Sequence, residues 1–144
     1  NVVDCYDIGL WNQLALIEGC DIFISPHTGF AFLAPCVNTP WLEIAGGDWP
    51  AYLFNDVPFY SVFPDNKEYP YLGKLGPHKY RKSGKIPGME SRKLDKKMPE
   101  IIKATKLLLN PKFTYKKSIE VHKQNIKKAN IRKKEINIPP FKFF

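Results

Sequence analysis

The first 63 residues alternate between apolar segments of helical length and apolar segments of strand length. Apolar positions at helical spacing predict a helix that Asp7 caps and that Gly19 closes in the left-handed conformation. The inward stripe of this helix consists of Leu10, Leu14 and Ile17, widened by Trp11 and Leu16.

Three short apolar runs have the length and composition of strands. They cover residues 21–25, 41–45 and 59–63, and the last is a candidate edge strand. Residues 30–34, between the first two runs, are apolar on all sides and predict a buried helix. Pro35 should end or kink that helix, because proline lacks the backbone N–H and crowds the preceding turn.

Helices and strands therefore alternate along this part of the chain, with a further short helix predicted over residues 49–53 behind an Asp48 cap. Such alternation with short connections is typical of right-handed crossovers and a parallel sheet. The predicted fold class is α/β, a partial Rossmann-like parallel sheet of about three strands with a basic C-terminal helical tail. Doubly wound sheets usually have about five or six strands, so we expect half of a domain or less.

The second half of the chain predicts helices behind a linker. Pro99 suits the first turn of a helix that ends at Asn110 and Pro111. A second helix is predicted from about residue 114 to about residue 134. The apolar stripe of the first helix is Ile101, Ile102, Thr105, Leu108 and Leu109, and that of the second is Ile119, His122, Ile126 and Ala129.

The charge of the chain changes sign near Gly73. The net charge is +8, but residues 1–73 contain one basic and nine acidic residues, whereas residues 74–144 contain 21 basic and five acidic residues. The two parts thus carry −8 and +16. We therefore divide the chain into a partial α/β domain at 1–73, a basic linker at 74–98 and a basic helical tail at 99–144.

The cysteine count and the hydropathy bear on the cellular compartment. The chain has an odd number of cysteines, Cys5, Cys20 and Cys36, and no CxxC pair. This argues against a disulfide framework or a zinc site and fits a reducing compartment. No apolar run reaches the length of about 18 residues that a membrane span needs. We expect a cytoplasmic protein or one associated with the inner face of a membrane. The first residues resemble neither an initiation site nor a signal peptide, so the chain is expected to be a piece of a longer protein.

The most informative chemistry lies in the turn after the first predicted strand. In an open parallel sheet, ligands bind beyond the carboxyl ends of the strands, and a helix N-terminus offers unpaired N–H groups to a phosphate. Gly29 allows close approach of an anion, and hydroxyl and imidazole groups add donors. The candidate diphosphate-binding residues are Ser25, His27, Thr28, Gly29 and Phe30. The alternative is that Thr28 is an ordinary N-cap and Gly29 an ordinary turn residue.

The segment 16–34, followed by Val37, Asn38, Thr39 and Pro40, resembles the C-terminal domain of GT-B glycosyltransferases. The likeness is greatest to the lipopolysaccharide heptosyltransferase type, glycosyltransferase family nine. Members of that family have a helix, an apolar strand, an acidic-Thr-Gly turn, a buried helix and a Thr-Pro turn into the next strand. In this chain His27 stands where the family has the acidic residue.

The resemblance implies that Thr28, Gly29 and neighbouring amides hold the diphosphate of a nucleotide sugar. It implies a metal-independent enzyme without a further cofactor, whose donor substrate is the nucleotide sugar. The catalytic base of such enzymes usually comes from an N-terminal domain, which would be the missing partner of this chain. The fragment alone should therefore bind nucleotide weakly and turn nothing over.

A carboxylate in the second predicted strand is a further candidate. Glu43 could accept hydrogen bonds from sugar or ribose hydroxyls, with Gly46 and Gly47 beside it. The alternative is a structural carboxylate that backbone donors of Gly46 and Gly47 satisfy.

A second function class follows from the basic half. Its lysines, interleaved with aromatic residues, suit a non-catalytic module that binds nucleic acid or an acidic partner, or a contact with an anionic membrane. They are also compatible with a merely solvated face. Nucleic acid is the weaker alternative, because the chain has only three arginines and no recognisable nucleic-acid-binding motif. Binding as salt is raised separates the classes, since a nucleic-acid module loses affinity steeply.

Overall fold

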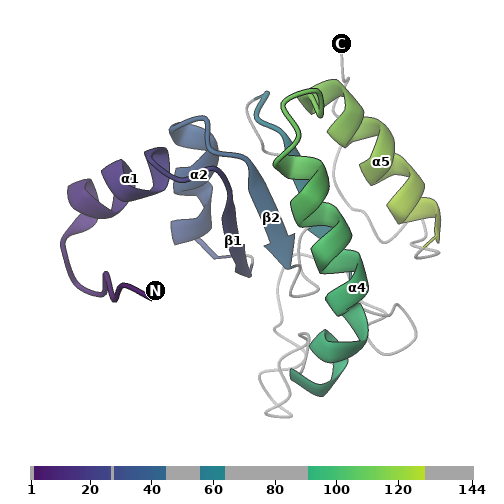
Figure 1. The fold of residues 1–144 in the computed structure, drawn as a ribbon. Helices are drawn as coiled ribbons and strands as arrows, with labels where there is room; N and C mark the ends of the chain where they lie inside the picture. Colours follow the sequence, from purple (N-terminus) through teal and green to yellow (C-terminus); the bar gives the residue numbers. More distant parts are fainter. Residues whose placement is uncertain (1, 27, 45–55, 64–90, 129–144) are drawn as a thin grey trace, which may run out of the picture.

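The computed structural model describes residues 2–26, 28–44, 56–63 and 91–128, without the side chains of 91–93, 126 and 127. Their centre is a three-stranded parallel sheet in the order β1-β2-β3 (Figure 1). The strands are β1 (Phe23–Pro26), β2 (Trp41–Ile44) and β3 (Phe59–Val62). The predicted α/β class with a parallel sheet is confirmed.

Helices lie on both faces of the sheet, as a parallel sheet requires. They are α1 (Leu10–Glu18), the 3-10 turn η1 (Phe30–Phe32), α2 (Leu33–Cys36), α4 (Ser91–Leu108) and α5 (Tyr115–Lys128). In Figure 1, α4 runs opposite to the strands and α5 returns in the strand direction.

The alternation of side chains along each strand divides the core into two clusters. Trp41 and Phe59 face α1, α2 and α5, where they pack with Ile17, Ala31, Ala34 and Ile119. Leu42 and Tyr60 face α4, where they pack with Val62, Ile101, Ala104, Leu108 and Phe113. The helices predicted as a separate tail thus share one core with the sheet. The boundary predicted near residue 73 lies outside the described residues.

The start of α4 corrects the sequence prediction. The helix begins at Ser91 rather than at Pro99, so residues 91–98 of the predicted linker are helical and Pro99 lies inside the helix. The reason is visible in the packing. Leu94 is half-buried against the core cluster that contains Leu42 and Tyr60. It lies seven residues before Ile101, on the same helical face, so its packing on the sheet favours a helix that continues through the proline.

The predicted N-terminal cap of α1 is wrong, whereas Gly19 closes the helix as predicted but in a different conformation. Asp7 has a φ of 59° and caps nothing; Gly9, with a φ of 84°, leads into the helix. Gly19 has right-handed dihedrals and donates to the Ala15 carbonyl at 3.1 Å, so it closes the helix without the left-handed conformation. Of the predicted stripe only Ile17 is fully buried. Leu14 is half-buried, and Leu10, Trp11 and Leu16 are exposed.

Pro35 lies one residue before the end of α2, which runs to Cys36, so the helix ends close to the predicted position. The chain enters α2 from η1, so Pro35 lies in the first turn of the α-helical part, where a backbone N–H has no helical partner in any case. Beyond Cys36 the chain leaves the helix through Val37 and Asn38, and Asn38 has a φ of 60°. The next N–H, of Thr39, donates to the Ala34 carbonyl at 3.0 Å, which is the Schellman pattern.

Thr39 also connects α1 to the sheet. Its hydroxyl is buried and donates to the Ile17 carbonyl at 2.8 Å. The following Pro40 carbonyl accepts from the N–H of Phe23 at 2.8 Å, which aligns β1 with β2. The Thr-Pro turn therefore holds the end of one helix and the start of two strands in place.

The outer margin of β3 is covered by α5. The Pro58 carbonyl accepts from Trp41 N–H at 3.1 Å on the β2 side, so the Phe59 N–H points the other way. It donates to Ser118 Oγ at 3.0 Å. A helix hydroxyl here takes the place of the carbonyl of a further strand.

Some predicted features lie outside the described residues. These are the Asp48-capped helix over residues 49–53, the end of the second strand at residue 45, and the continuation of α5 to residue 134 with Ala129.

Candidate functional site

The candidate corner lies where β1 ends and η1 begins. Thr28 is exposed, and its Oγ1 accepts from the Ala31 N–H at 3.2 Å while its carbonyl accepts from the same N–H at 3.1 Å. Thr28 thus performs the capping role that the sequence allowed as an alternative. The capping bond occupies its hydroxyl as an acceptor and leaves the hydroxyl proton available to a ligand.

Gly29 is open to solvent and conformationally ordinary. Its φ of −56° and ψ of −38° are right-handed helical, and a Cβ built on it would meet no atom within 4 Å. The described part of the fold therefore does not require glycine at position 29. The N–H groups of Thr28 and Gly29 donate to no described residue. N–H groups at the start of a helical turn can donate to an anion.

Ser25 and Phe30 lie on either side of the corner and differ in their contacts and exposure. Ser25 Oγ accepts from the indole Nε1 of Trp41 at 3.0 Å, which fixes the hydroxyl beside β2. Phe30 is 41% exposed, and its ring meets Phe23 edge-on with centroids 6.3 Å apart. Phe30 thus presents an apolar edge next to the exposed amides, whereas Ser25 stands further inside.

Glu43 lies in the middle of the sheet. Its side chain is fully buried, and Ser61 Oγ donates to its Oε2 at 2.8 Å. Register places Ser25, Glu43 and Ser61 in one row across the three strands. One partner of the carboxylate is therefore Ser61 on the neighbouring strand. Burial keeps Glu43 out of reach of a ligand in this structure, and its predicted contact with sugar hydroxyls stays a prediction.

Three predicted site residues, His27, Gly46 and Gly47, lie outside the described residues. The structure thus brings Ser25, Thr28, Gly29 and Phe30 together at one corner and places Glu43 in the sheet next to Ser25.

The predicted apolar stripe of α5 contains one polar residue, His122, and the structure buries it. His122 is 6% exposed between the rings of Phe59 and Phe63, with centroids 5.2 and 5.5 Å away. Its Nδ1 and the nearby Asn125 Nδ2 are buried without a hydrogen-bond partner. Burial lowers the pKa of His122 to about 4, so the imidazole is neutral at pH 7.

A second polar cluster joins α4 to β3. Tyr60 Oη donates to Glu100 Oε1 at 3.3 Å, and Lys97 Nζ donates to Glu100 Oε2 at 3.2 Å. Burial, and then the adjacent Glu100 charge, raise the pKa of Tyr60. The hydroxyl therefore stays protonated and acts as a donor. The local pattern of apolar and polar residues could not predict this contact, because Tyr60 and Glu100 are 40 positions apart in the sequence.

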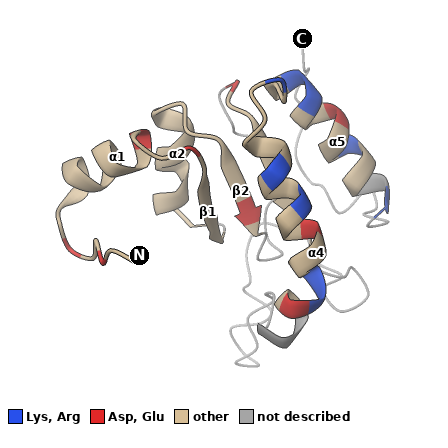
Figure 2. Cartoon of the chain, viewed as in Figure 1, with Lys and Arg blue, Asp and Glu red and all other residues tan. Residues whose placement is uncertain are grey.

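The charges separate in space as they do in sequence. Figure 2 shows lysines on α4 and α5, whereas the described residues from 2 to 63 have no Lys or Arg. Within the described residues no group of three or more His, Cys, Asp or Glu could hold a metal ion. None of the described helices is long and apolar enough to cross a membrane.

Comparison of the chain with protein-family models, curated proteins and solved structures found no significant match.

Proposed function

We propose that the chain is the donor-binding half of a metal-independent GT-B glycosyltransferase, with the corner at residues 25–30 holding the diphosphate of a nucleotide sugar. The observation that carries the proposal is the exposure of Thr28 and Gly29, whose N–H groups donate to no described residue. The parallel sheet with helices on both faces supports a partial Rossmann-like domain, which binds ligands beyond the carboxyl ends of its strands. The corner follows the carboxyl end of β1.

The corner would act on the leaving group. As the glycosidic bond breaks, negative charge grows on the diphosphate, and preorganised N–H groups stabilise that charge in the transition state. Acceptor activation falls to the missing N-terminal domain. The chain alone therefore binds nucleotide without turnover.

Backbone amides would carry most of the recognition. The described residues of the acidic part, 2–26, 28–44 and 56–63, contain no Lys or Arg. Binding that relies on amides releases few counterions, so its affinity should depend weakly on salt. The second function class, a Lys-rich module for nucleic acid or an acidic partner, predicts the opposite.

The test is binding of a nucleoside diphosphate, UDP or ADP, to the full chain by isothermal titration, with Gly29→Asp as the variant. A Cβ at Gly29 meets open space, so the variant should fold. A carboxylate about 5 Å from a diphosphate of about two charges costs about 1.7 kcal/mol even in water. We expect Kd to rise about fifteenfold or more.

Gly19→Asp is the matched control, since Gly19 is exposed, has room for a Cβ, and lies away from the corner. Unchanged affinity in the control and weakened affinity in Gly29→Asp would support the proposal. Equal affinity of both variants and the parent chain would reject the corner as the diphosphate site. Loss of binding by more than about tenfold between low and moderate salt would favour the Lys-rich module instead.

A further inference from the structure

The outer face of α4, together with Leu109 directly after its last residue, carries an exposed apolar stripe beside exposed lysines. Met98, Ile102 and Leu109 are 42, 49 and 50% exposed. At 3.6 residues per turn they fall within an arc of about 40°. Measured around the helix axis from Ile102, Lys106 lies about 40° away and Lys103 about 100° away. Both lysines are exposed, and neither makes an ion pair with a described residue.

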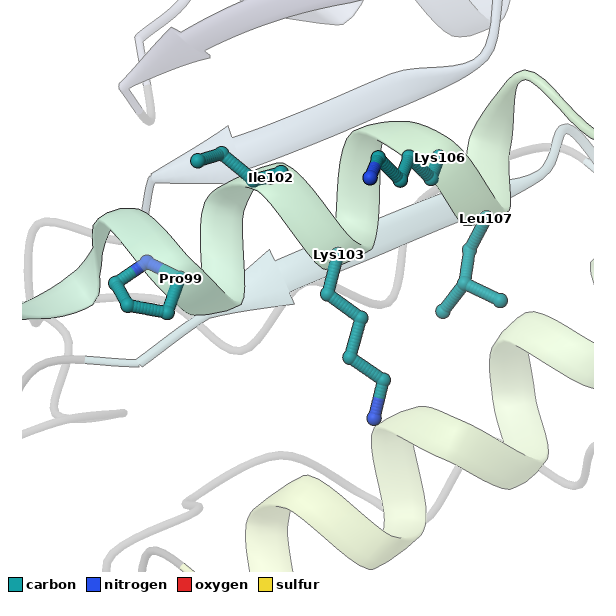
Figure 3. Close-up of a pocket in the computed structure, with 5 residues that line it drawn as sticks. All are labelled: Pro99, Ile102, Lys103, Lys106 and Leu107. Atoms are coloured by element: carbon teal, nitrogen blue, oxygen red, sulfur yellow. The ribbon is translucent and has the colours of Figure 1, made fainter.

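A shallow pocket adjoins this stripe on the side of the two lysines. It has a volume of about 410 Å³ and a mostly apolar lining of Pro99, Ile102, Lys103, Lys106 and Leu107 (Figure 3). In Figure 3 the side chains of Lys103 and Leu107 point toward α5. Apolar carbons and ammonium groups thus border the same hollow.

We propose that this face of α4 binds the surface of an anionic lipid bilayer. Lysines attract acidic headgroups, and the aliphatic stripe enters the boundary between headgroups and acyl chains, as in interfacial helices. The sheet covers the opposite side of α4, so the helix lies along the membrane without entering it. The proposal does not depend on the diphosphate corner, which is on a different part of the fold.

The composition of this face favours lipid over nucleic acid. Residues 94–109 contain no aromatic residue and no Arg, the residues that stack on bases or read phosphate in a bidentate manner. They do contain the aliphatic side chains that a bilayer boundary accepts. Charge complementarity to an acidic protein would not account for the exposed stripe.

The test is cosedimentation of the full chain with vesicles of phosphatidylcholine and phosphatidylglycerol, compared with vesicles of phosphatidylcholine alone. The first variant is Lys103→Gln with Lys106→Gln. Each lysine near an anionic surface contributes about fivefold to binding, so this variant should bind about thirtyfold more weakly. Its control, Lys112→Gln with Lys116→Gln, removes the same charge from exposed positions elsewhere and should bind like the parent chain.

The second variant removes the stripe. Ile102→Ser with Leu109→Ser should weaken binding to the anionic vesicles about tenfold or more. Its control is Leu10→Ser with Leu16→Ser on α1, two exposed leucines that face no lysine of their own helix. Circular dichroism confirms that each variant is folded.

Three results would overturn the proposal. They are equal binding to neutral and anionic vesicles, an equal loss in the α4 variants and their controls, and capture of an acidic peptide or oligonucleotide without binding of vesicles.

Discussion

Acidification should weaken the fold through one buried imidazole. His122 lies between Phe59 and Phe63 with its Nδ1 unpartnered, and its pKa is lowered from 6.5 to about 4 because it is buried. The folded pKa is below the unfolded pKa, so the unfolded chain takes up the proton first. The stabilising contribution is complete above the unfolded pKa and is lost as the pH falls from 6.5 toward 4.

The magnitude follows from the two pKa values. The full shift corresponds to about 3 kcal/mol of unfolding free energy. Between about pH 7.5 and about pH 5 the expected loss is about 2 kcal/mol. That is a measurable fraction of the stability of a small domain.

The assay is urea unfolding at both pH values for the parent chain and for His122→Leu. The leucine variant removes the titrating group and fills a similar space, while the other histidines and the carboxyl groups titrate equally in both proteins. The parent chain should lose about 2 kcal/mol more than the variant on acidification. An equal loss in the two proteins would refute the reasoning. It would mean that the imidazole reaches solvent or gains a partner.

Three further changes should alter the free energy of unfolding measured in urea. Ser61→Ala should lower it by about 1–3 kcal/mol, because the buried Glu43 carboxylate loses a donor at 2.8 Å; an unchanged value would mean that this bond is not formed. Thr39→Val should lower it by about 1–2 kcal/mol, because the buried Ile17 carbonyl loses its hydroxyl partner; no loss would show that water replaces the hydroxyl. Pro99→Ala should raise it by up to about 3 kcal/mol, because the helix regains an N–H at an exposed interior position; a decrease would show that the proline ring packs.

The sequence predicted the three strands and their parallel pairing, because short apolar runs between helical segments leave few other topologies. It predicted the covering helices of the second half less well. The lysines and Pro99 make the apolar periodicity that starts at Leu94 difficult to recognise in the sequence. The unfavourable helix propensity of Pro99 is outweighed by the packing of the helix on the sheet. For α1 the sequence instead predicted more burial than the structure shows. Its apolar stripe was real, but only Ile17 reaches the described core.

The candidate corner was predicted in position and only partly in detail. The turn after β1 follows from local sequence, as does the capping role of Thr28. The environment of Glu43 could not be derived, because its partner Ser61 depends on the register of two strands that local sequence does not fix. The same holds for His122, whose burial depends on where α5 meets β3.

The hydroxyl of Ser118 has a consequence for how molecules of this protein can meet. By accepting the Phe59 N–H it occupies one donor that the outer side of β3 would otherwise offer to another chain, whereas β1 is the terminal strand at the other side of the described sheet. A sheet that can extend in one direction alone cannot polymerise by strand addition. If β1 is the margin of the described sheet that stays open, two copies joined along it would stop at a dimer rather than grow into a fibre.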